Sequence, residues 1–323
     1  MQKRADSDLL EVKVARRLDE AQDIVSLEFV PASGFSLLAF EAGSHVDVHV
    51  APGVVRQYSI CNDPRESHRY VFGILREPQS RGGSEAIHAQ FAEGRVLRIS
   101  PPRNNFRLIE NARHSILAGG GIGITPILSM AWRLHALGSS FELHYCTRAL
   151  ARTAFRDVLK SAPFADRISL HLDDGPREQQ FDIDACLAKP GADTHLYACG
   201  PGGFMEHVTG GATRLGWAAD HVHTEYFSAD VDVTGDVFTV RAARSGLTLT
   251  IPANQSIADV LLANNIELPL SCEQGVCGTC VTPVLEGVPD HRDFYFTDEE
   301  RAANDQMTPC CSRAKTPLIV LDI

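Results

Sequence analysis

The first third of the chain carries short apolar runs in which apolar and polar positions alternate. Val46, Val48 and Val50, for example, are separated by polar residues, which is the period of a strand with one buried face. Gly, Pro, Asn and Asp separate one run from the next. Many short strands at regular spacing predict an antiparallel β-barrel. The predicted strands cover residues 11–16, 24–30, 45–50, 54–60, 69–76 and 95–100.

Near Arg107 the pattern changes to apolar strands that alternate with helical stretches. Residues 115–118 predict a buried strand, and a Gly-rich turn then leads into a helix from residue 126 to about residue 137. Alternating strands and helices predict an α/β domain with a parallel sheet that helices cover on both faces. The further strands cover residues 141–145, 168–172 and 195–199, the last of which is expected to be the final strand of the sheet.

A polar, unpatterned stretch, residues 228–236, is typical of a linker. Beyond it, residues 238–241 and 247–251 predict a hairpin, and Ser256 is placed to cap a short helix. The sequence therefore predicts a multidomain protein. The predicted division is a β-barrel at 1–106, an α/β domain at 107–228, a linker at 229–235 and an α+β domain at 236–323.

Length and charge narrow the class of protein. The 323 residues are enough for two or three domains with cores of their own. The net charge of −11 argues against nucleic acid as a partner. No apolar run approaches the roughly 18–20 residues that span a membrane, and the polar N-terminus lacks the apolar core of a secretory signal. We therefore expect a cytoplasmic protein with no membrane partner.

Nine cysteines form an odd set in a chain without an export signal, so disulfides are not expected to be their main use. Cys272, Cys277 and Cys280 follow the spacing C-x₄-C-x₂-C, and a further Cys comes later, at Cys310 or Cys311. This is the plant-type spacing for a [2Fe–2S] cluster, and spacing alone does not choose between the last two.

The alternative for these cysteines is a structural zinc site. Zinc sites usually pair two short C-x₂₋₄-C segments, whereas here three cysteines share one loop, which favours the iron–sulfur cluster. Gly275 and Gly278 would let the loop wrap closely around it. The cysteines outside the loop that are expected to be ordinary buried residues are Cys61, Cys146 and Cys186.

Two segments of the predicted barrel have the chemistry of a flavin site. Arg56, Tyr58 and Ser59, followed by Ile60, are expected on one strand face, where they offer a cation for phosphate, an aromatic ring and a hydroxyl donor. The turn Ser80-Arg81-Gly82-Gly83-Ser84 opens a predicted helix at residues 85–91, and free N–H groups beside Arg81 suit a phosphate. A mobile Gly loop is the ordinary alternative.

Two Gly-rich turns of the α/β part have the chemistry of a nucleotide site. Gly120, Gly121 and Gly123 allow a diphosphate close to the backbone, with Thr125 expected as the helix N-cap. The glycine spacing departs from the Rossmann fingerprint. The second turn, Cys199-Gly200-Pro201, ends the strand at 195–199, where Cys199 is expected to face the nicotinamide; a buried core cysteine is the alternative.

Along the chain these motifs come in the order flavin, nucleotide and cysteine loop. In that order they resemble the ferredoxin–NADP reductase superfamily, and more closely the phthalate dioxygenase reductase and vanillate O-demethylase reductase family. The resemblance covers nearly the whole chain. It implies an FMN-binding barrel, an NAD-binding α/β domain and a C-terminal β-grasp ferredoxin domain. It also implies a monomer, and a Rieske-type terminal oxygenase as the protein partner.

The same resemblance assigns residues to the cofactors. It makes Cys310 the fourth iron ligand and places Cys311 in a small apolar slot. It puts Thr125 and Cys199 where nicotinamide meets flavin, with Phe227 near the flavin. The residues that it implies for contact with FMN are Arg56, Tyr58, Ser59, Gly82, Gly83 and Ser84.

The predicted function is a reductase that passes electrons from NADH to FMN, to the [2Fe–2S] cluster and to an oxygenase. Ser59, Thr125 and Cys199 are its expected positioning residues. Asp173 and Asp174 would repel a 2′-phosphate, which favours NADH, although they can also cap a turn. The alternatives are a free-standing NADH:acceptor reductase for a quinone or ferric iron, and a non-catalytic module that binds zinc and a nucleotide.

The last part of the chain is acidic. From residue 235 to residue 323 it carries twelve acidic and six basic residues, a net charge of −6. This is either a solvated surface or a docking face for a basic partner, whose encounter it would speed.

Overall fold

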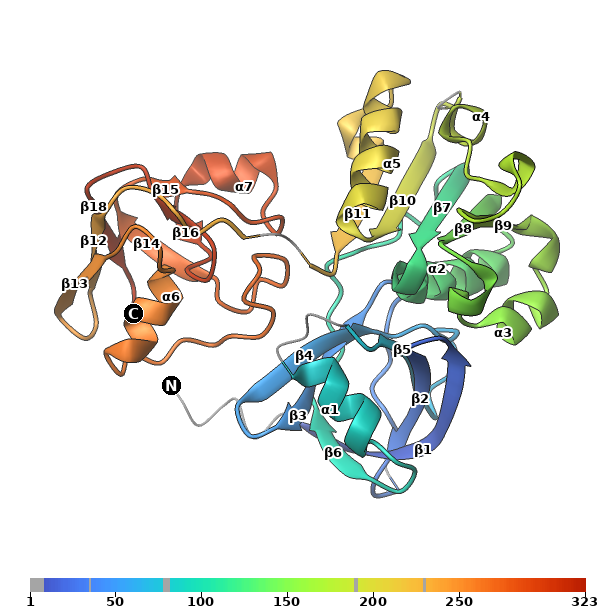
Figure 1. Cartoon of the computed structure of the whole chain (residues 1–323), viewed down its shortest axis with the longest axis horizontal. Coiled ribbons are helices and arrows are strands. Elements are labelled where there is room, and N and C mark those ends of the chain that lie inside the picture. Colours follow the sequence, from blue (N-terminus) through green and yellow to red (C-terminus); the bar gives the residue numbers. More distant parts are fainter. Residues whose placement is uncertain (1–8, 35, 78–81, 189–190, 229–230) are drawn as a thin grey trace. The chain divides into compact units, whose positions relative to one another are not determined.

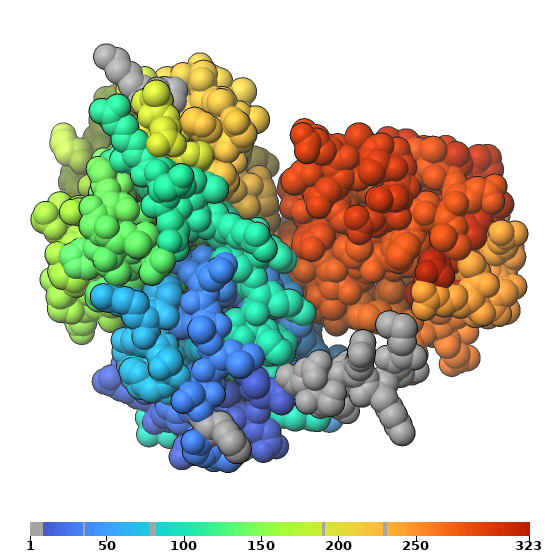
Figure 2. Space-filling model, turned by 180° about the vertical axis from the view of Figure 1, so that it is seen from behind, coloured from blue at the N-terminus to red at the C-terminus, as the bar shows by residue number. Residues whose placement is uncertain are grey.

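The computed structural model describes residues 9–34, 36–77, 82–188, 191–228 and 231–323 (Figure 1). The chain divides into two compact units, Met1–Phe227 and Ser228–Ile323. Figure 2 shows each as a closely packed body, the first in blue to yellow and the second in orange to red. None of the helices in the described ranges has both the length and the apolar character needed to cross a bilayer.

The first unit begins with a six-stranded antiparallel sheet in the order β4-β3-β6-β1-β2-β5. A bridge between Ile60, just after β4, and Phe72 of β5 joins the two edges and closes the sheet into a barrel. Val46, Val48 and Val50 lie in its core, as their alternation predicts. The elements are β1 (Leu10–Ala21), β2 (Ile24–Pro31), β3 (His45–Ala51), β4 (Val54–Ser59), β5 (Tyr70–Leu75), α1 (Gly83–Gln90) and β6 (Val96–Ile99).

All six predicted barrel strands are present, but β1 is much longer than residues 11–16. Its second half, from Arg16 to Ala21, still pairs with β2. Charged residues occupy most of this half, and they hide the apolar alternation on which the prediction relied. Pairing with a neighbouring strand decides the conformation here, and local composition does not.

The second part of this unit is a five-stranded parallel sheet in the order β11-β10-β7-β8-β9. Helices α2 and α3 contribute to the apolar core on one face, and α4 and α5 to the core on the other, which confirms the predicted double layer. The elements are β7 (His114–Gly120), α2 (Ile124–Leu137), β8 (Phe141–Thr147), α3 (Arg156–Ser161), β9 (Ile168–Leu172), α4 (Ile183–Leu187), β10 (Thr194–Gly200), α5 (Gly202–Arg214) and β11 (Val222–Tyr226).

Two predictions for this sheet are wrong. The strand at 195–199 is not the last, because β11 follows it and pairs parallel to β10. β11 reads Val-His-Thr-Glu-Tyr and is half-buried along its length, so it has no apolar run. Thr125 is not a helix cap, because a 3₁₀ turn, Gly121–Gly123, leads directly into α2 at Ile124, and the Thr125 hydroxyl donates to the Ile122 carbonyl.

The second unit is built on a five-stranded mixed sheet in the order β13-β12-β18-β14-β16, in which β12 and β18 run parallel. The predicted hairpin is confirmed, and Ser256 caps α6 by accepting from the Asp259 N–H. The elements are β12 (Phe238–Ala242), β13 (Leu247–Ile251), α6 (Ile257–Ala263), β14 (Thr282–Glu286), β15 (Pro289–Asp290), α7 (Asp298–Ala303), β16 (Gln306–Met307), β17 (Arg313–Ala314) and β18 (Leu318–Leu321).

A buried arginine ties the start of this unit to its sheet. Arg313 is only 2% exposed, and its guanidinium lies 5.0 Å from the centre of the Phe238 ring. A buried cation is tolerated only when hydrogen bonds replace its water, and here four backbone carbonyls do so. These carbonyls belong to Val233, Asp236, Pro252 and Gln255.

We expect Arg313→Met to destabilise the second unit by about 3–5 kcal/mol, because the change leaves several buried carbonyls without donors. Hydrogen exchange of the β12 and β18 amides in the full chain measures this loss. Arg241→Met, at an exposed position of β12, is the matched control and should change little. Equal protection in the two variants would contradict the role assigned to Arg313.

Candidate functional site

The cysteine loop lies between α6 and β14, and it brings the predicted iron ligands together in two pairs. A hydrogen bond between the sulfurs of Cys272 and Cys277 raises the pKa of Cys272 and lowers the pKa of Cys277. A second sulfur contact joins Cys310 to Cys280 and raises the pKa of the Cys310 thiol. Two thiolates for each iron is what a [2Fe–2S] cluster bound by four cysteines requires. The residues present therefore fit this cofactor.

The structure favours Cys310 over Cys311 as the fourth ligand. Cys310 contacts the Cys280 thiol of the loop, whereas the fully buried Cys311 sulfur contacts only Cys310 among the predicted ligands and lies 3.1 Å from the Thr308 hydroxyl. Gly275 packs against the same sulfur, and a Cβ at this glycine would lie 2.5 Å from it. Cys311 thus fills a small slot behind the loop, while the assignment of Cys310 stays a prediction.

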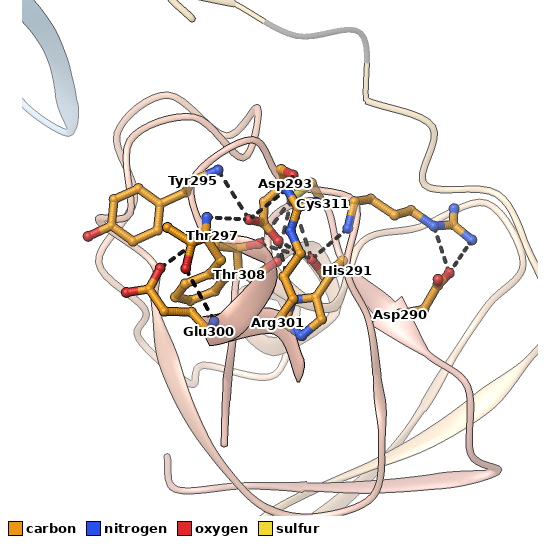
Figure 3. A network of polar contacts seen from close by, with 12 residues as sticks. Asp290, His291, Asp293, Tyr295, Thr297, Glu300, Arg301, Thr308 and Cys311 are labelled. Carbon is orange, nitrogen blue, oxygen red and sulfur yellow. Dashed lines mark hydrogen bonds and ion pairs between the residues drawn. The ribbon is translucent and has the colours of Figure 1, made fainter. Parts of the chain in front are cut away.

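A polar network supports the cysteine loop, and no sequence motif announced it (Figure 3). The fully buried carboxylate of Asp293 accepts from the N–H groups of Tyr295, at 3.1 Å, and Phe296, at 2.8 Å. Its other oxygen accepts from the Ser312 hydroxyl. The Phe294 N–H donates to the Gly275 carbonyl, which ties this segment to the cysteine loop. Residues 291–297 therefore hold the loop from outside.

In the first unit, the two predicted phosphate-binding segments meet. Arg56 on β4 packs over Gly83, where an added Cβ would lie 2.6 Å from the Arg56 Cγ. Gly82 has a φ of 87° and offers no side-chain cap to α1, so a side-chain cap does not occupy the first N–H groups of the helix. A guanidinium beside a helix N-terminus fits a phosphate. Arg81, also predicted here, lies outside the described residues.

Ser84 helps to shape this turn, because its hydroxyl accepts from the Glu77 N–H at 3.1 Å. Tyr58 is half-buried against the barrel core, and burial raises the pKa of its phenol. The expectation that Arg56, Tyr58 and Ser59 share one strand face is wrong. Tyr58 and Ser59 are adjacent on β4, so their side chains point to opposite faces.

A carboxyl group that sequence reasoning missed accepts a hydrogen bond from Ser59. The Ser59 hydroxyl lies 3.5 Å from Oε2 of Glu225, on β11. Burial raises the pKa of Glu225 to about 8, although the Ser59 hydrogen bond lowers it. Glu225 is paired with Cys199 in the β10–β11 register, so all three residues gather where the barrel meets the parallel sheet. The only sequence signal was a Glu within a strand that was not recognised.

The two Gly-rich turns lie side by side at the carboxyl ends of β7 and β10. A Cβ at Gly123 would overlap the carbonyl of Cys199, and one at Gly200 would lie 3.0 Å from the Gly120 Cα. The Phe204 ring covers both Gly120 and Gly200. Nucleotides bind at such strand ends, and the bare backbone fits a diphosphate. The other turn residues predicted for it are Gly121, with a φ of 54°, and Pro201, the N-cap of α5.

The barrel contacts the nucleotide-binding part of the same unit at Gly73. A Cβ at Gly73 of β5 would lie 2.9 Å from Thr125 Cγ2 and from the Phe155 ring. Thr125 and Cys199 are both buried in this region, and Phe227 packs against the same core. The structure thus brings Thr125 next to the barrel and Cys199 next to Glu225. Contact of these residues with nicotinamide or flavin stays a prediction.

Known proteins resemble this chain both in its second unit and over nearly its whole length. Residues 240–315 match the family of 2Fe-2S iron-sulfur cluster binding domains. The chain is 52% identical to vanillate O-demethylase oxidoreductase of Pseudomonas putida, over 98% of this chain and 100% of the relative. It is 43% identical to tetrachlorobenzoquinone reductase of Sphingobium chlorophenolicum, over 94% of each. The family match favours an iron–sulfur cluster over zinc for the cysteine loop.

A solved structure matches nearly the whole chain. Phthalate dioxygenase reductase, described as a modular structure for electron transfer from pyridine nucleotides to [2Fe–2S], matches with a TM-score of 0.76 and 40% identity. The match covers 98% of this chain and 99% of the solved one.

Cys310→Ala and Cys311→Ala form a matched pair of variants. We expect Cys310→Ala to lose the cluster and its iron, because three thiolates leave one iron without its second ligand. Cys311→Ala should keep the full iron content, since its sulfur points at Thr308. Iron analysis and the visible spectrum of each purified variant give the answer, and the reverse pattern would make Cys311 the ligand.

Glu225→Gln should remove a pH dependence of stability. The pKa of Glu225 rises from 4.5 to about 8 on folding, so the unfolded carboxyl ionises between these values while the folded one stays neutral, and stability falls as pH rises through this window. The expected loss is on the order of 2 kcal/mol, because one pKa unit is worth about 1.4 kcal/mol and solvent screens a partly exposed carboxyl.

The measurement is the melting temperature of the loaded protein from pH 5 to pH 9, in roughly half-unit steps across the window in which the carboxyl titrates. Wild type should lose stability with rising pH more steeply than Glu225→Gln does. Glu206→Gln, at an exposed position of α5, should behave as wild type. Parallel curves for wild type and Glu225→Gln would contradict the assigned pKa.

Proposed function

Because the chain belongs to the reductase family that includes vanillate O-demethylase oxidoreductase and phthalate dioxygenase reductase, we propose that it serves a Rieske-type terminal oxygenase or O-demethylase that acts on an aromatic acid. The protein is an electron-transfer oxidoreductase with FMN, NADH and a [2Fe–2S] cluster as its cofactors. The observation that carries the proposal is that one chain holds both a nucleotide-binding edge beside a barrel and two thiol pairs in a ferredoxin-type unit.

The number of electrons that each cofactor transfers explains why one chain needs both a flavin-binding unit and an iron–sulfur unit. NADH gives up two electrons as a hydride, whereas a [2Fe–2S] cluster accepts one, and bound FMN supplies the conversion between them. The role proposed for the protein's own residues is placement. Arg56 and the start of α1 hold the FMN phosphate, and the turns at Gly120–Gly123 and Cys199–Pro201 hold the dinucleotide. Ser59, with its hydroxyl fixed by Glu225, orients the flavin edge.

The finer domain assignment belongs to the same proposal. It takes residues 1–106 as the FMN barrel, 107–228 as the NAD domain and 229–235 as the linker. The remaining residues, 236–323, form a β-grasp ferredoxin domain. The protein works as a monomer.

The preference for NADH over NADPH rests on the turn after β9. Asp173 and Asp174 are exposed there, and their N–H groups donate to the carbonyls of Thr147 and Arg148, next to the carboxyl end of β8. Two carboxylates at this edge would repel a 2′-phosphate.

A protein acceptor is favoured by charge. The last part of the chain, from residue 235, carries a net charge of −6, which suits a basic docking face and speeds encounter at low salt. A quinone is the second candidate acceptor, because a relative of 43% identity is named a tetrachlorobenzoquinone reductase. The oxygenase must take its electrons from the [2Fe–2S] cluster, whereas a quinone can take them from the flavin.

Product formation with a purified Rieske-type oxygenase and vanillate tests the proposal. Wild type and Cys311→Ala should support NADH-dependent release of formaldehyde from the methoxy group, and added salt should slow it. Cys310→Ala should fall to background with the oxygenase yet still reduce a flavin-reactive dye from NADH. The oxygenase assignment would be overturned if Cys310→Ala supported full formaldehyde release by the oxygenase. It would also be overturned if wild type reduced a quinone but supported no formaldehyde release.

A further inference from the structure

Two imidazoles and a thiol meet on the sheet face that carries α4, close in sequence to the turn that bears Asp173 and Asp174. They are His144 of β8, His171 of β9 and Cys186 of α4, and one ligand atom of each lies within 4.8 Å of the other two. Nδ1 of His144 is 3.0 Å from Nε2 of His171 and 3.7 Å from Sγ of Cys186. Cys186 is only half-buried, so the expectation of an ordinary buried cysteine does not hold for it.

The fold itself brings the three residues together. In the parallel register of β8 and β9, His171 lies opposite Cys146, two positions along the strand from His144, so both imidazoles leave the same face of the sheet. Helix α4 is docked on this face by Ile183 and Leu187, which are buried in the apolar core there. Each ligand thus comes from a different element with its own packing, which fixes the cluster before any ion binds.

The spacing matches a tetrahedral zinc site. Imidazole nitrogens and a thiolate at 2.0–2.3 Å from zinc lie roughly 3.3–3.7 Å from one another. The distances from His144 to His171 and to Cys186, 3.0 Å and 3.7 Å, differ from this range by a few tenths of an ångström at most, and the third, between His171 and Cys186, is within 4.8 Å. Imidazole and thiolate are also the ligand types that zinc prefers over carboxylate-rich or all-oxygen sites.

A supporting shell holds the two rings in place. The Phe181 ring packs against both, with centroids 5.5 Å from His144 and 5.1 Å from His171. Oε1 of Glu142 lies 3.7 Å from Nε2 of His144, on the side of the ring away from the cluster, which is an ion-pair distance and too long for a hydrogen bond.

Hydrogen bonds alone account less well for the cluster. Nδ1 of His144 faces both the His171 nitrogen and the Cys186 sulfur, but one imidazole nitrogen carries either one proton or one lone pair. Whichever tautomer is present, it makes a full hydrogen bond to only one of its two neighbours. A cation satisfies all three atoms at once through their lone pairs.

We propose that His144, His171 and Cys186 bind a zinc ion, with a water molecule in the fourth position. Binding displaces the thiol proton of Cys186 to solvent and leaves both imidazoles neutral, so no electron moves. The site is separate from the cysteine loop, which lies in the other unit. It shares no residue with the Gly-rich turns, and it does not depend on the proposed function.

Zinc binding to the full chain, loaded with flavin and cluster and washed with a chelator, tests the proposal. After equilibrium dialysis against micromolar zinc sulfate, metal analysis should find one zinc per chain with the iron content unchanged. Cys186→Ser and His171→Ala should each bind zinc at least ~10-fold more weakly, since even outer-shell partners of ligating histidines are worth 10–100-fold in metal affinity. His68→Ala, at an exposed position of the barrel, should bind as wild type.

Alkylation of Cys186 gives an independent readout. Outside the cysteine loop, Cys186 is the one cysteine that is not buried, so iodoacetamide should modify it first, and one equivalent of zinc should protect it. Reduction of the flavin by NADH in each variant shows that the nucleotide part is folded. Zinc binding that survives both substitutions, zinc that binds only as iron is lost, or alkylation that zinc does not slow would overturn the proposal.

Discussion

A Cβ atom at Gly123 would overlap the carbonyl of Cys199, and the same lack of space recurs at other glycines of the two units. Gly200 lies against Gly120 at the nucleotide-binding edge, and Gly73 brings the barrel against Thr125. In the second unit, Gly275 approaches the sulfur of Cys311 in the same way. Residues far apart in the sequence reach bonding distance because these backbones can touch, so close approach at glycine underlies both sites.

Ser59 and Glu225 show what this close packing produces. The hydroxyl at the end of a barrel strand reaches a carboxyl on the parallel sheet, and the crowded surroundings keep that carboxyl protonated near neutral pH. A neutral acid at this position can donate as well as accept a hydrogen bond, and it adds no negative charge beside Ser59 and Cys199. The network around Asp293 has the opposite character. Backbone N–H groups and Arg301 surround a buried carboxylate, which fixes the segment that covers the cysteine loop.

Sequence patterns predicted what local chemistry determines. Alternating valines located the barrel strands, Ser256 marked the start of α6, and cysteine spacing indicated the iron–sulfur domain. Patterns failed where tertiary pairing decides the outcome. β11 is polar because it is half-buried at the edge of its sheet, and Glu225 could not be assigned while that strand was missing. The trio of His144, His171 and Cys186 comes from three separate elements, so no spacing in the sequence announces it.

The central claim is that one chain carries electrons from NADH through its flavin to its own [2Fe–2S] cluster. An anaerobic NADH titration, followed by the visible spectrum and by EPR at low temperature, tests it most directly. We expect NADH to bleach both flavin and cluster bands, and the EPR signal of a reduced [2Fe–2S] cluster to grow as they bleach. A flavin that NADH reduces fully while the cluster stays oxidised and EPR-silent would contradict it.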